Sequence, residues 1–239
     1  MKLFEWLRPP KRPQPQALTP RQLMRLTQLP RSKPLSEQPL RDQRWVVLDL
    51  ETSGLNMSRD EVLSIGALVI EDGAIDFAQQ FERTLLRTDH KLNPSVLIHG
   101  LGPSAIAAGT EPVEALLDFM EFVGDSPVLA FHAPFDQHMI GRALKESLGY
   151  RLQHHFFDVA EMAPMLCPQA TFRQAGLDDW TGFFGLHAEE RHHASADAMV
   201  TAELALILFS HARRQDIDSP ARLDQQLSQW RRRQKSHSF

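Results

Sequence analysis

Cysteine is nearly absent from the 239-residue sequence, and so are long apolar runs. The single cysteine, Cys167, has no second cysteine with which to build a disulfide framework or a cysteine-based zinc site. No apolar run approaches the roughly 18 to 20 residues that cross a bilayer. In the opening segment MKLFEWLRPP, Glu5 interrupts a short apolar run, which argues against a secretory signal. These absences favour a protein without a membrane span in a reducing, cytoplasmic compartment.

Basic residues are scarce in the middle of the chain and concentrated at its two ends. Residues 45–210 carry nine Lys or Arg and twenty-four Asp or Glu, a balance of −15. Residues 1–44 carry ten and three (+7), residues 211–239 carry seven and three (+4), and the three balances sum to −4. Such an acidic middle would need metal ions to hold a polyanion, with the basic flanks offsetting repulsion. An ordinary solvated acidic surface explains the same charges, so other features must decide.

Proline and apolar patterning divide the chain into three parts. Eight of the sixteen prolines fall in residues 1–43, which predicts a mostly irregular or extended segment. Apolar periodicity runs from there to about residue 210, which is enough chain for one domain. We therefore expect an N-terminal extension over 1–43, a globular domain over 44–210 and a basic helical tail over 211–239.

The order of predicted strands and helices indicates the fold class. Strands are expected over 44–50, 61–70, 74–84, 127–132 and 154–157. Helices are expected over 2–7, 20–28, 94–100, 111–123, 134–148, 158–166, 173–184, 194–213 and 219–234, with a short one from Pro103. A hairpin at 71–73 followed by alternating strands and helices predicts an α/β fold. Its mixed sheet should have about five strands flanked by helices.

Two carboxylates, Asp49 and Glu51, end the first predicted strand in the stretch WVVLDLETSGL. Side chains two positions apart on a strand point to the same side, so both carboxylates face one small volume. Such a pair in an apolar segment is costly unless a cation lies between its members. Thr52, Ser53 and Gly54 then turn the chain and bring backbone close to any bound molecule. A strand running into a polar turn explains this stretch equally well, so the rest of the chain must decide.

Two further acids and a histidine lie where a site at the strand ends needs them. Asp136, in FHAPFDQHM, falls in the first turn of a predicted helix, where an acid also complements the helix dipole. His192 precedes Asp197 by five residues at the start of the longest predicted helix. A lone histidine before a helix is usually structural. Here the histidine lies five residues before Asp197, and three other acids (Asp49, Glu51 and Asp136) follow predicted strands, so a shared site is favoured.

Four carboxylates and one imidazole form a donor set suited to hard cations. Oxygen ligands without cysteine favour Mg²⁺ or Mn²⁺ over zinc. Four carboxylates can hold two such ions about 3.5–4 Å apart, the arrangement that assists phosphoryl chemistry. A histidine, whose unperturbed pKa is about 6.5, can accept a proton near neutral pH. The predicted cofactors are therefore two divalent cations, Mg²⁺ or Mn²⁺.

The order of these motifs resembles a known family. D-x-E-T-(T/S)-G, then F-D after a strand, then H-x(4)-D before a long helix is similar to the DEDDh exonucleases. This is the DnaQ-like group that includes the proofreading epsilon subunit of bacterial DNA polymerase III. The resemblance covers about residues 45–210 and implies an RNase H-like fold with 3′→5′ hydrolysis to nucleoside 5′-monophosphates. In two places the chain departs from the family's usual H-N-x-x-F-D, with Phe131 and His132 in place of H-N.

The resemblance also implies roles for individual residues. Asp49, Glu51 and Asp197 would hold one ion, Asp49 would also reach a second ion near Asp136, and His192 would be the general base. The residues expected to contact the terminal nucleotide are Thr52, Ser53, Gly54, Leu55, His99 and Phe135. For His99, in the segment IHGL, a helix that ends at Gly100 is the alternative explanation. The subgroup with tyrosine in place of the histidine is excluded, because the only tyrosine, Tyr150, is far from Asp197 in the sequence.

Three functions remain open on these residues. The first is a metal-dependent exonuclease acting on single-stranded DNA or a DNA 3′ end. The second is an RNA-trimming 3′→5′ exoribonuclease, because no residue unambiguously recognises a 2′-hydroxyl. The third is a non-catalytic nucleic-acid-binding adaptor on the same fold, which the intact acids and histidine disfavour.

Partners follow from the same interpretation. The expected partner is a single-stranded 3′ end, and both basic tails could hold its phosphates. A polymerase or a sliding clamp is a candidate protein partner, since proofreading would need a second protein. Residues 226–230 (QLSQW) loosely resemble a clamp-binding peptide, although an ordinary apolar helix stripe explains them better.

Overall fold

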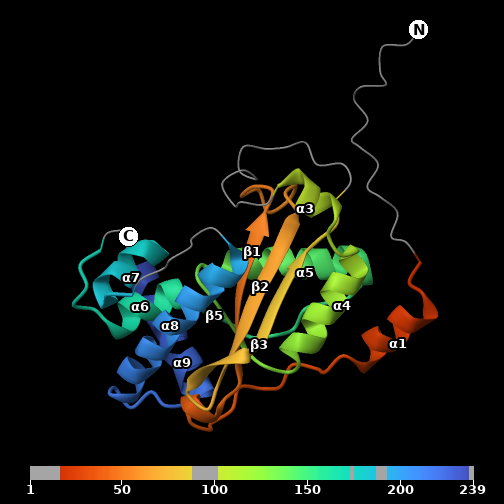
Figure 1. Cartoon of the computed structure of the whole chain (residues 1–239). Coiled ribbons are helices and arrows are strands. Elements are labelled where there is room, and N and C mark those ends of the chain that lie inside the picture. The colour runs from red at the N-terminus through yellow and green to blue at the C-terminus, as the bar shows by residue number, and fades with distance from the viewer. Residues whose placement is uncertain (1–16, 88–101, 173–174, 187–192, 237–239) are drawn as a thin grey trace.

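The computed structural model describes residues 17–87, 102–172, 175–186 and 193–236, and these form helices around one mixed sheet (Figure 1). The five strands are β1 (Trp45–Thr52), β2 (Val62–Glu71), β3 (Ala74–Thr84), β4 (Val128–Ala130) and β5 (Phe156–Asp158). They lie in the order β3-β2-β1-β4-β5. The first three pair antiparallel, whereas β4 and β5 run parallel to β1. The predicted α/β fold with a mixed five-stranded sheet is confirmed.

The helices largely follow the predicted ranges. They are α1 (Pro20–Gln28), the 3-10 turn η2 (Leu40–Asp42), α3 (Pro103–Ala107), α4 (Pro112–Val123), α5 (Ala133–Leu148), α6 (Val159–Leu166), α7 (Leu177–Phe184), α8 (Ala194–Arg213) and α9 (Pro220–Ser236). The expected helix over 173–184 begins only at Leu177. The expected helices over 2–7 and 94–100 lie outside the described residues.

β1 is the central strand, and its side chains alternate between two hydrophobic cores. Trp45 and Val47 pack in one core together with residues of α6, α8 and α9. Val46 and Leu48 pack in the other, with residues of α4 and α5. Figure 1 shows α8 on one side of the sheet and α4 and α5 on the other. Because alternate residues of a strand point to opposite faces, Asp49 continues the Trp45 row and faces the α8 side.

The predicted ends of two strands needed correction. β1 continues to Thr52 rather than ending at residue 50, because Glu51 still pairs with Ser64 of β2. β4 ends at Ala130 rather than residue 132, because the chain turns at once into α5. His132 makes this turn with a left-handed φ of 62°. Both corrections concern the carboxyl edge of the sheet, where the candidate site lies.

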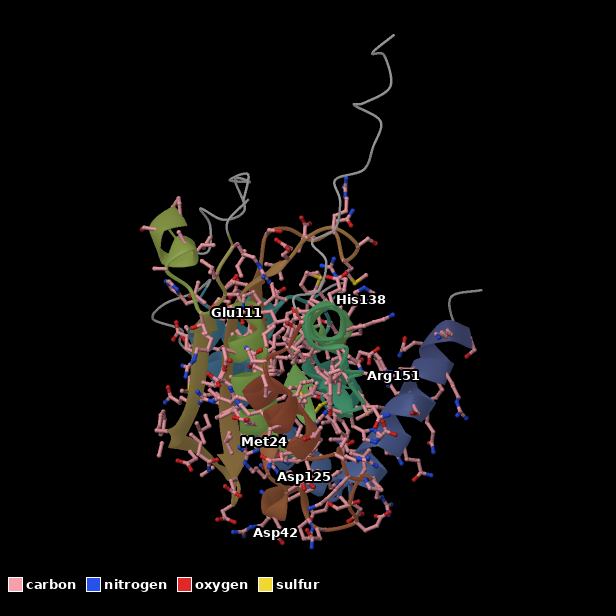
Figure 2. All side chains as sticks on the ribbon, turned by 90° about the vertical axis from the view of Figure 1, so that its right-hand side faces the viewer. Met24, Asp42, Glu111, Asp125, His138 and Arg151 are labelled. Carbon is pink, nitrogen blue, oxygen red and sulfur yellow. The ribbon has the colours of Figure 1, made fainter. Side chains whose placement is uncertain are left out.

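The N-terminal segment is docked onto the domain through α1. Thr19 begins α1 with a capping box, and the Arg25 guanidinium reaches three carboxylates of α4. Its ion pairs to Glu114, Asp118 and Glu121 measure 2.6, 2.6 and 2.7 Å. In Figure 2, α1 with its exposed Met24 faces the viewer. Residues 20–28 are thus fixed to the acidic helix α4 by charge.

The N-terminal and C-terminal segments also contact each other, near the amino end of β1. Leu40 donates its N–H to the carbonyl of Asp218 at 3.2 Å, and Ala221 donates to the carbonyl of Ser36 at 3.1 Å. In α9, Leu227 is buried in the core, as an ordinary apolar helix stripe predicts. Among the described segments, none of the helices combines the length and apolar character that a bilayer span requires.

Candidate active site

Three of the predicted carboxylates gather at the carboxyl end of β1. Asp49 and Glu51 come from β1, and Asp197 comes from the first turn of α8. Each offers one oxygen, and these oxygens all lie within 4.8 Å of one another. Glu51 is 4% exposed and Asp197 9% exposed, so the group is largely removed from water. Residues 148 positions apart in the sequence are therefore brought within reach of one ion.

A glycine of β2 allows α8 to approach this closely. Gly66 lies directly opposite Asp49 in the β1–β2 pairing. A Cβ added at Gly66 would lie 2.2 Å from the carbonyl carbon of Ala194 and 2.3 Å from the backbone nitrogen of Ser195. The backbone of the first turn of α8 therefore rests directly on β2, and this contact sets the position of Asp197. The sequence prediction missed this residue, although a glycine inside a buried strand signals a close backbone approach.

Asp136 lies beside this group and is held by the backbone. It is 5% exposed in the first turn of α5, and the N–H of Leu50 in β1 hydrogen-bonds to its carboxyl group. Burial raises the pKa of Asp136 well above its usual value, and the nearby Asp158 carboxylate acts in the same direction. Asp136 does not belong to the tightest group of three, but its charge also acts on Glu51.

The electrostatics of the group favour a bound cation. Burial raises the pKa of Glu51 to about 8, and the negative charges of Asp197 and Asp136 contribute to the rise. Crowded carboxylates resist ionisation unless a positive charge balances them. The donors are carboxylate oxygens, which suit Mg²⁺ and Mn²⁺. The residues present therefore fit a divalent cation held by Asp49, Glu51 and Asp197.

Glu51 gives a prediction for stability against pH. Its pKa is 4.5 in an unfolded chain and about 8 in the fold, so the unfolded state loses its proton first as the pH rises. In EDTA, the free energy of unfolding should therefore fall by a few kcal/mol between about pH 4.5 and pH 8. Thermal unfolding measured between pH 4.5 and pH 8 checks this fall in stability.

Two controls accompany the pH profile. Mg²⁺ or Mn²⁺ should raise the melting temperature most at the alkaline end, and Glu51→Gln should flatten the profile. A profile in EDTA that rises towards pH 8 would contradict the assignment.

The turn before Asp136 is held by a carboxylate that the sequence did not single out. Asp158, 5% exposed at the end of β5, accepts N–H hydrogen bonds from His132 and Ala160, each at 3.0 Å. The first bond fixes the left-handed residue that precedes α5, and the second caps α6. The ring of Phe131 contacts the His132 ring edge to face at 4.8 Å between centroids. Phe131 and His132, the two residues that differ from the family's motif, therefore lie in the turn that leads to Asp136.

The residues expected to contact substrate lie on two segments near the carboxylates. Thr52 is buried and donates its hydroxyl hydrogen to the carbonyl of Gly54 at 2.9 Å. Leu55, in the loop after β1, is 86% exposed. Phe135 is partly buried against the core on the α4–α5 side. Ser53 donates its N–H to the carbonyl of Glu61 at 2.9 Å, while His99 and the candidate base His192 lie outside the described residues.

The fold and the carboxylates define a class of protein. A mixed sheet that brings buried carboxylates together at the end of its central strand is the arrangement implied by the resemblance to the exonucleases. A family model described as "Exonuclease" matches residues 46–205, and the chain belongs to this exonuclease family. The resemblance to the DEDDh exonucleases is thereby confirmed.

The relatives with similar sequences are much longer proteins, of which only one segment matches this chain. The chain is 30% identical over 166 residues to the DNA polymerase III PolC-type of Thermotoga maritima, covering 69% of this chain and 12% of that protein. It is 29% identical over 169 residues to the same polymerase type of Clostridium perfringens, covering 70% and 11%. The chain thus spans only about an eighth of the length of these curated relatives.

Solved structures share the fold. E. coli exonuclease I in complex with a dA16 oligonucleotide superposes with a TM-score of 0.61 at 17% identity, covering 72% of this chain and 42% of that one. Cell-death related nuclease 4 superposes with a TM-score of 0.62 at 11% identity, covering 71% and 64%. These matches confirm the predicted RNase H-like exonuclease fold.

Proposed function

We propose that the chain is a 3′→5′ exonuclease that hydrolyses the terminal phosphodiester of single-stranded DNA and releases nucleoside 5′-monophosphates. The observation that carries the proposal is the group of Asp49, Glu51 and Asp197, with oxygens within 4.8 Å of one another. DNA as substrate is supported by the polymerase relatives and by the oligonucleotide bound to exonuclease I. Without bound cations, the acidic middle segment, residues 45–210, would repel the phosphates of a strand.

The carboxylates have distinct tasks in this proposal. Asp49, Glu51 and Asp197 would hold one divalent cation, and Asp49 with Asp136 would hold a second, each Mg²⁺ or Mn²⁺. When bound, such cations stabilise the charge that develops on the attacking and leaving oxygens of a phosphodiester. Glu51 would join the ligand set as the carboxylate, with its proton released to solvent. Asp136 is kept in place by the N–H of Leu50, while Thr52, Ser53, Gly54, Leu55, His99 and Phe135 orient the terminal nucleotide.

His192 is the proposed general base, which takes a proton from the attacking water. General-base catalysis contributes about 10²–10⁴-fold to a rate, so His192→Ala should slow digestion by several hundred-fold or more. The matched control is His193→Ala, which removes the neighbouring imidazole at the residue that precedes α8. Steady-state rates on a labelled single strand measure both. A His192→Ala enzyme that keeps the full rate would remove His192 from the mechanism.

A digestion panel tests the proposal and its two alternatives. Matched single-stranded DNA, double-stranded DNA, RNA and a mismatched primer end are incubated with Mg²⁺ or Mn²⁺, with EDTA as the control. We expect 5′-monophosphates in the metal-containing samples, fastest from single-stranded DNA. Faster release from RNA would favour the exoribonuclease. Binding without release of any nucleotide would favour the non-catalytic adaptor.

Protein partners remain part of the proposal. The polymerase relatives suggest that a polymerase works beside this chain. The clamp-peptide interpretation of residues 226–230 is disfavoured, because Leu227 is buried in the core. The exposed Arg232 and Lys235 near the end of α9 are candidates for phosphate contacts, and affinity for a strand should then fall steeply with salt.

A further inference from the structure

The loop between β1 and β2, residues 53–61, presents apolar side chains to solvent beside the carboxylate group. Leu55 is 86% exposed and Met57 42% exposed. The loop starts two residues after Glu51 and is closed at its base, where Ser53 donates its N–H to the carbonyl of Glu61 at 2.9 Å. The shape of this loop therefore sets where the Leu55 side chain is presented.

One carboxylate, Asp60, fixes the shape of this loop. Its Oδ2 accepts the N–H of Asn56 at 2.7 Å, and its Oδ1 accepts the hydroxyl hydrogen of Ser53 at 3.2 Å. The Ser53 Oγ in turn accepts the N–H of Glu61 at 3.0 Å. The backbone N–H of Asp60 donates to the carbonyl of Asn56 at 2.8 Å. Asp60 therefore bonds to residues on both sides of Leu55.

Gly54 lets the Asp60 carboxylate lie this deep in the loop. A Cβ at Gly54 would lie 2.5 Å from Asp60 Oδ2 and 2.9 Å from its carboxyl carbon. The carboxylate thus packs directly against the backbone of the residue before Leu55. Any side chain at Gly54 would displace it.

Helix α5 ties the loop to the catalytic carboxylates. Arg142 of α5 donates from its guanidinium Nη2 to the carbonyl of Asp60. Arg142 follows Asp136 by six residues on the same helix, which is about 9 Å along its axis. Figure 2 views α5 nearly end-on, with His138 labelled on it. The loop and Asp136 are therefore positioned by the same rigid element.

We propose that Asp60 is a positioning residue, which acts through the loop to hold Leu55 against the base of the terminal nucleotide. The inference rests on the proposed function of the same site. Asp60 has both carboxylate oxygens engaged by Asn56 and Ser53, so its effect on substrate passes through the placement of Leu55. Removal of the Asp60 carboxylate should weaken binding of the strand and leave the rate of the chemical step unchanged.

The test separates binding from chemistry. Asp60→Ala should raise KM for a single strand about tenfold while kcat stays within about twofold. Fluorescence anisotropy in Mg²⁺, with a labelled strand whose 3′-terminal linkage cannot be hydrolysed, should show the same loss of affinity. Asp60→Asn should retain most of the affinity, since its amide oxygen can accept from Asn56 while its amide N–H donates to Ser53. The matched control is Asp42→Ala, which removes an exposed carboxylate of η2, labelled in Figure 2, at the other end of β1.

Double variants test whether Asp60 acts through Leu55. In a Leu55→Ala background, Asp60→Ala should add nothing to KM. Gly54→Ala should raise KM in the wild-type background but add nothing to the KM of Asp60→Ala, because the Asp60 carboxylate that the new Cβ would meet is then absent. If Asp60→Ala fails to fold, Ser53→Ala removes one of the same hydrogen bonds. It should raise KM about threefold in the wild-type background and add nothing in the Leu55→Ala background, where a direct contact of Ser53 with the strand would still count.

Two results would overturn the role of Asp60. One is an unchanged KM and affinity in Asp60→Ala, or in Ser53→Ala should the first fail to fold. The other is a rise in KM on Asp60→Ala that adds fully to the rise caused by Leu55→Ala. A wild-type chain that digests no strand contradicts the proposed function instead, so the two failures are distinguishable.

Discussion

Asparagine in place of Asp49 is expected to slow digestion by at least about 10²–10³-fold, the loss that follows removal of one charge-stabilising group from an active site. Asp49 belongs to the group of three carboxylates within 4.8 Å and is also proposed to reach the second cation. Asparagine keeps the shape of the side chain but is neutral, so the fold should survive while cation binding weakens. Single-turnover rates at saturating strand and increasing Mn²⁺ measure the effect.

The control for Asp49 is an asparagine placed far from the group. Asp42→Asn changes the net charge equally at the amino end of β1 and should leave the rate unchanged. Raising the Mn²⁺ concentration should recover part of the Asp49→Asn rate if the defect lies in cation binding. A rate within tenfold of the wild-type rate at low Mn²⁺ would show that Asp49 is not a ligand of a required cation.

Alanine at Gly66 is expected to reduce the rate by about 10²-fold, although Gly66 touches no substrate. The new Cβ would lie 2.2 Å from backbone atoms of α8, which cannot rotate away as a side chain would. The first turn of α8 must therefore move and carry Asp197 away from Asp49 and Glu51. A misplacement of about 1 Å at an active site can cost 10²-fold. The overpacked contact should also lower the free energy of unfolding by about 1–3 kcal/mol.

Gly182 of α7 is the matched control for Gly66. A Cβ at Gly182 would meet nothing within 4 Å, and this residue lies inside a helix. Gly182→Ala should therefore keep the wild-type rate and stabilise the chain slightly. Calorimetric titration with Mn²⁺ should show weaker binding for Gly66→Ala than for Gly182→Ala. Equal affinities and equal rates would mean that the close approach of α8 to β2 does not set the position of Asp197.

Local sequence patterns were sufficient to predict the carboxylates of β1. The strand period of two placed Asp49 and Glu51 on one face, and both indeed lie with Asp197 on the α8 side. The start of α8 at Ala194 also matched the prediction. These features depend on residues close together in the sequence, where strand and helix periods hold whatever surrounds them.

Contacts between distant segments could not be predicted in the same way. Gly66 matters because it meets the backbone of Ala194, which is 128 residues later in the sequence. Asp158 holds the turn at His132, and neither residue carries a local signal of this contact. Prolines in the N-terminal extension predicted irregular structure. They gave no sign that Arg25 would bind three acids of α4 about ninety residues away.

The most direct test of the account is a time course on a single-stranded DNA labelled at its 5′ end, with Mg²⁺ and with EDTA. With Mg²⁺ the label should pass through successively shorter strands, one nucleotide at a time, while 5′-monophosphates accumulate. With EDTA the strand should remain intact. Release of the label as a mononucleotide at the earliest times, internal cuts, or equal digestion in EDTA would contradict a metal-dependent 3′→5′ exonuclease centred on Asp49, Glu51 and Asp197.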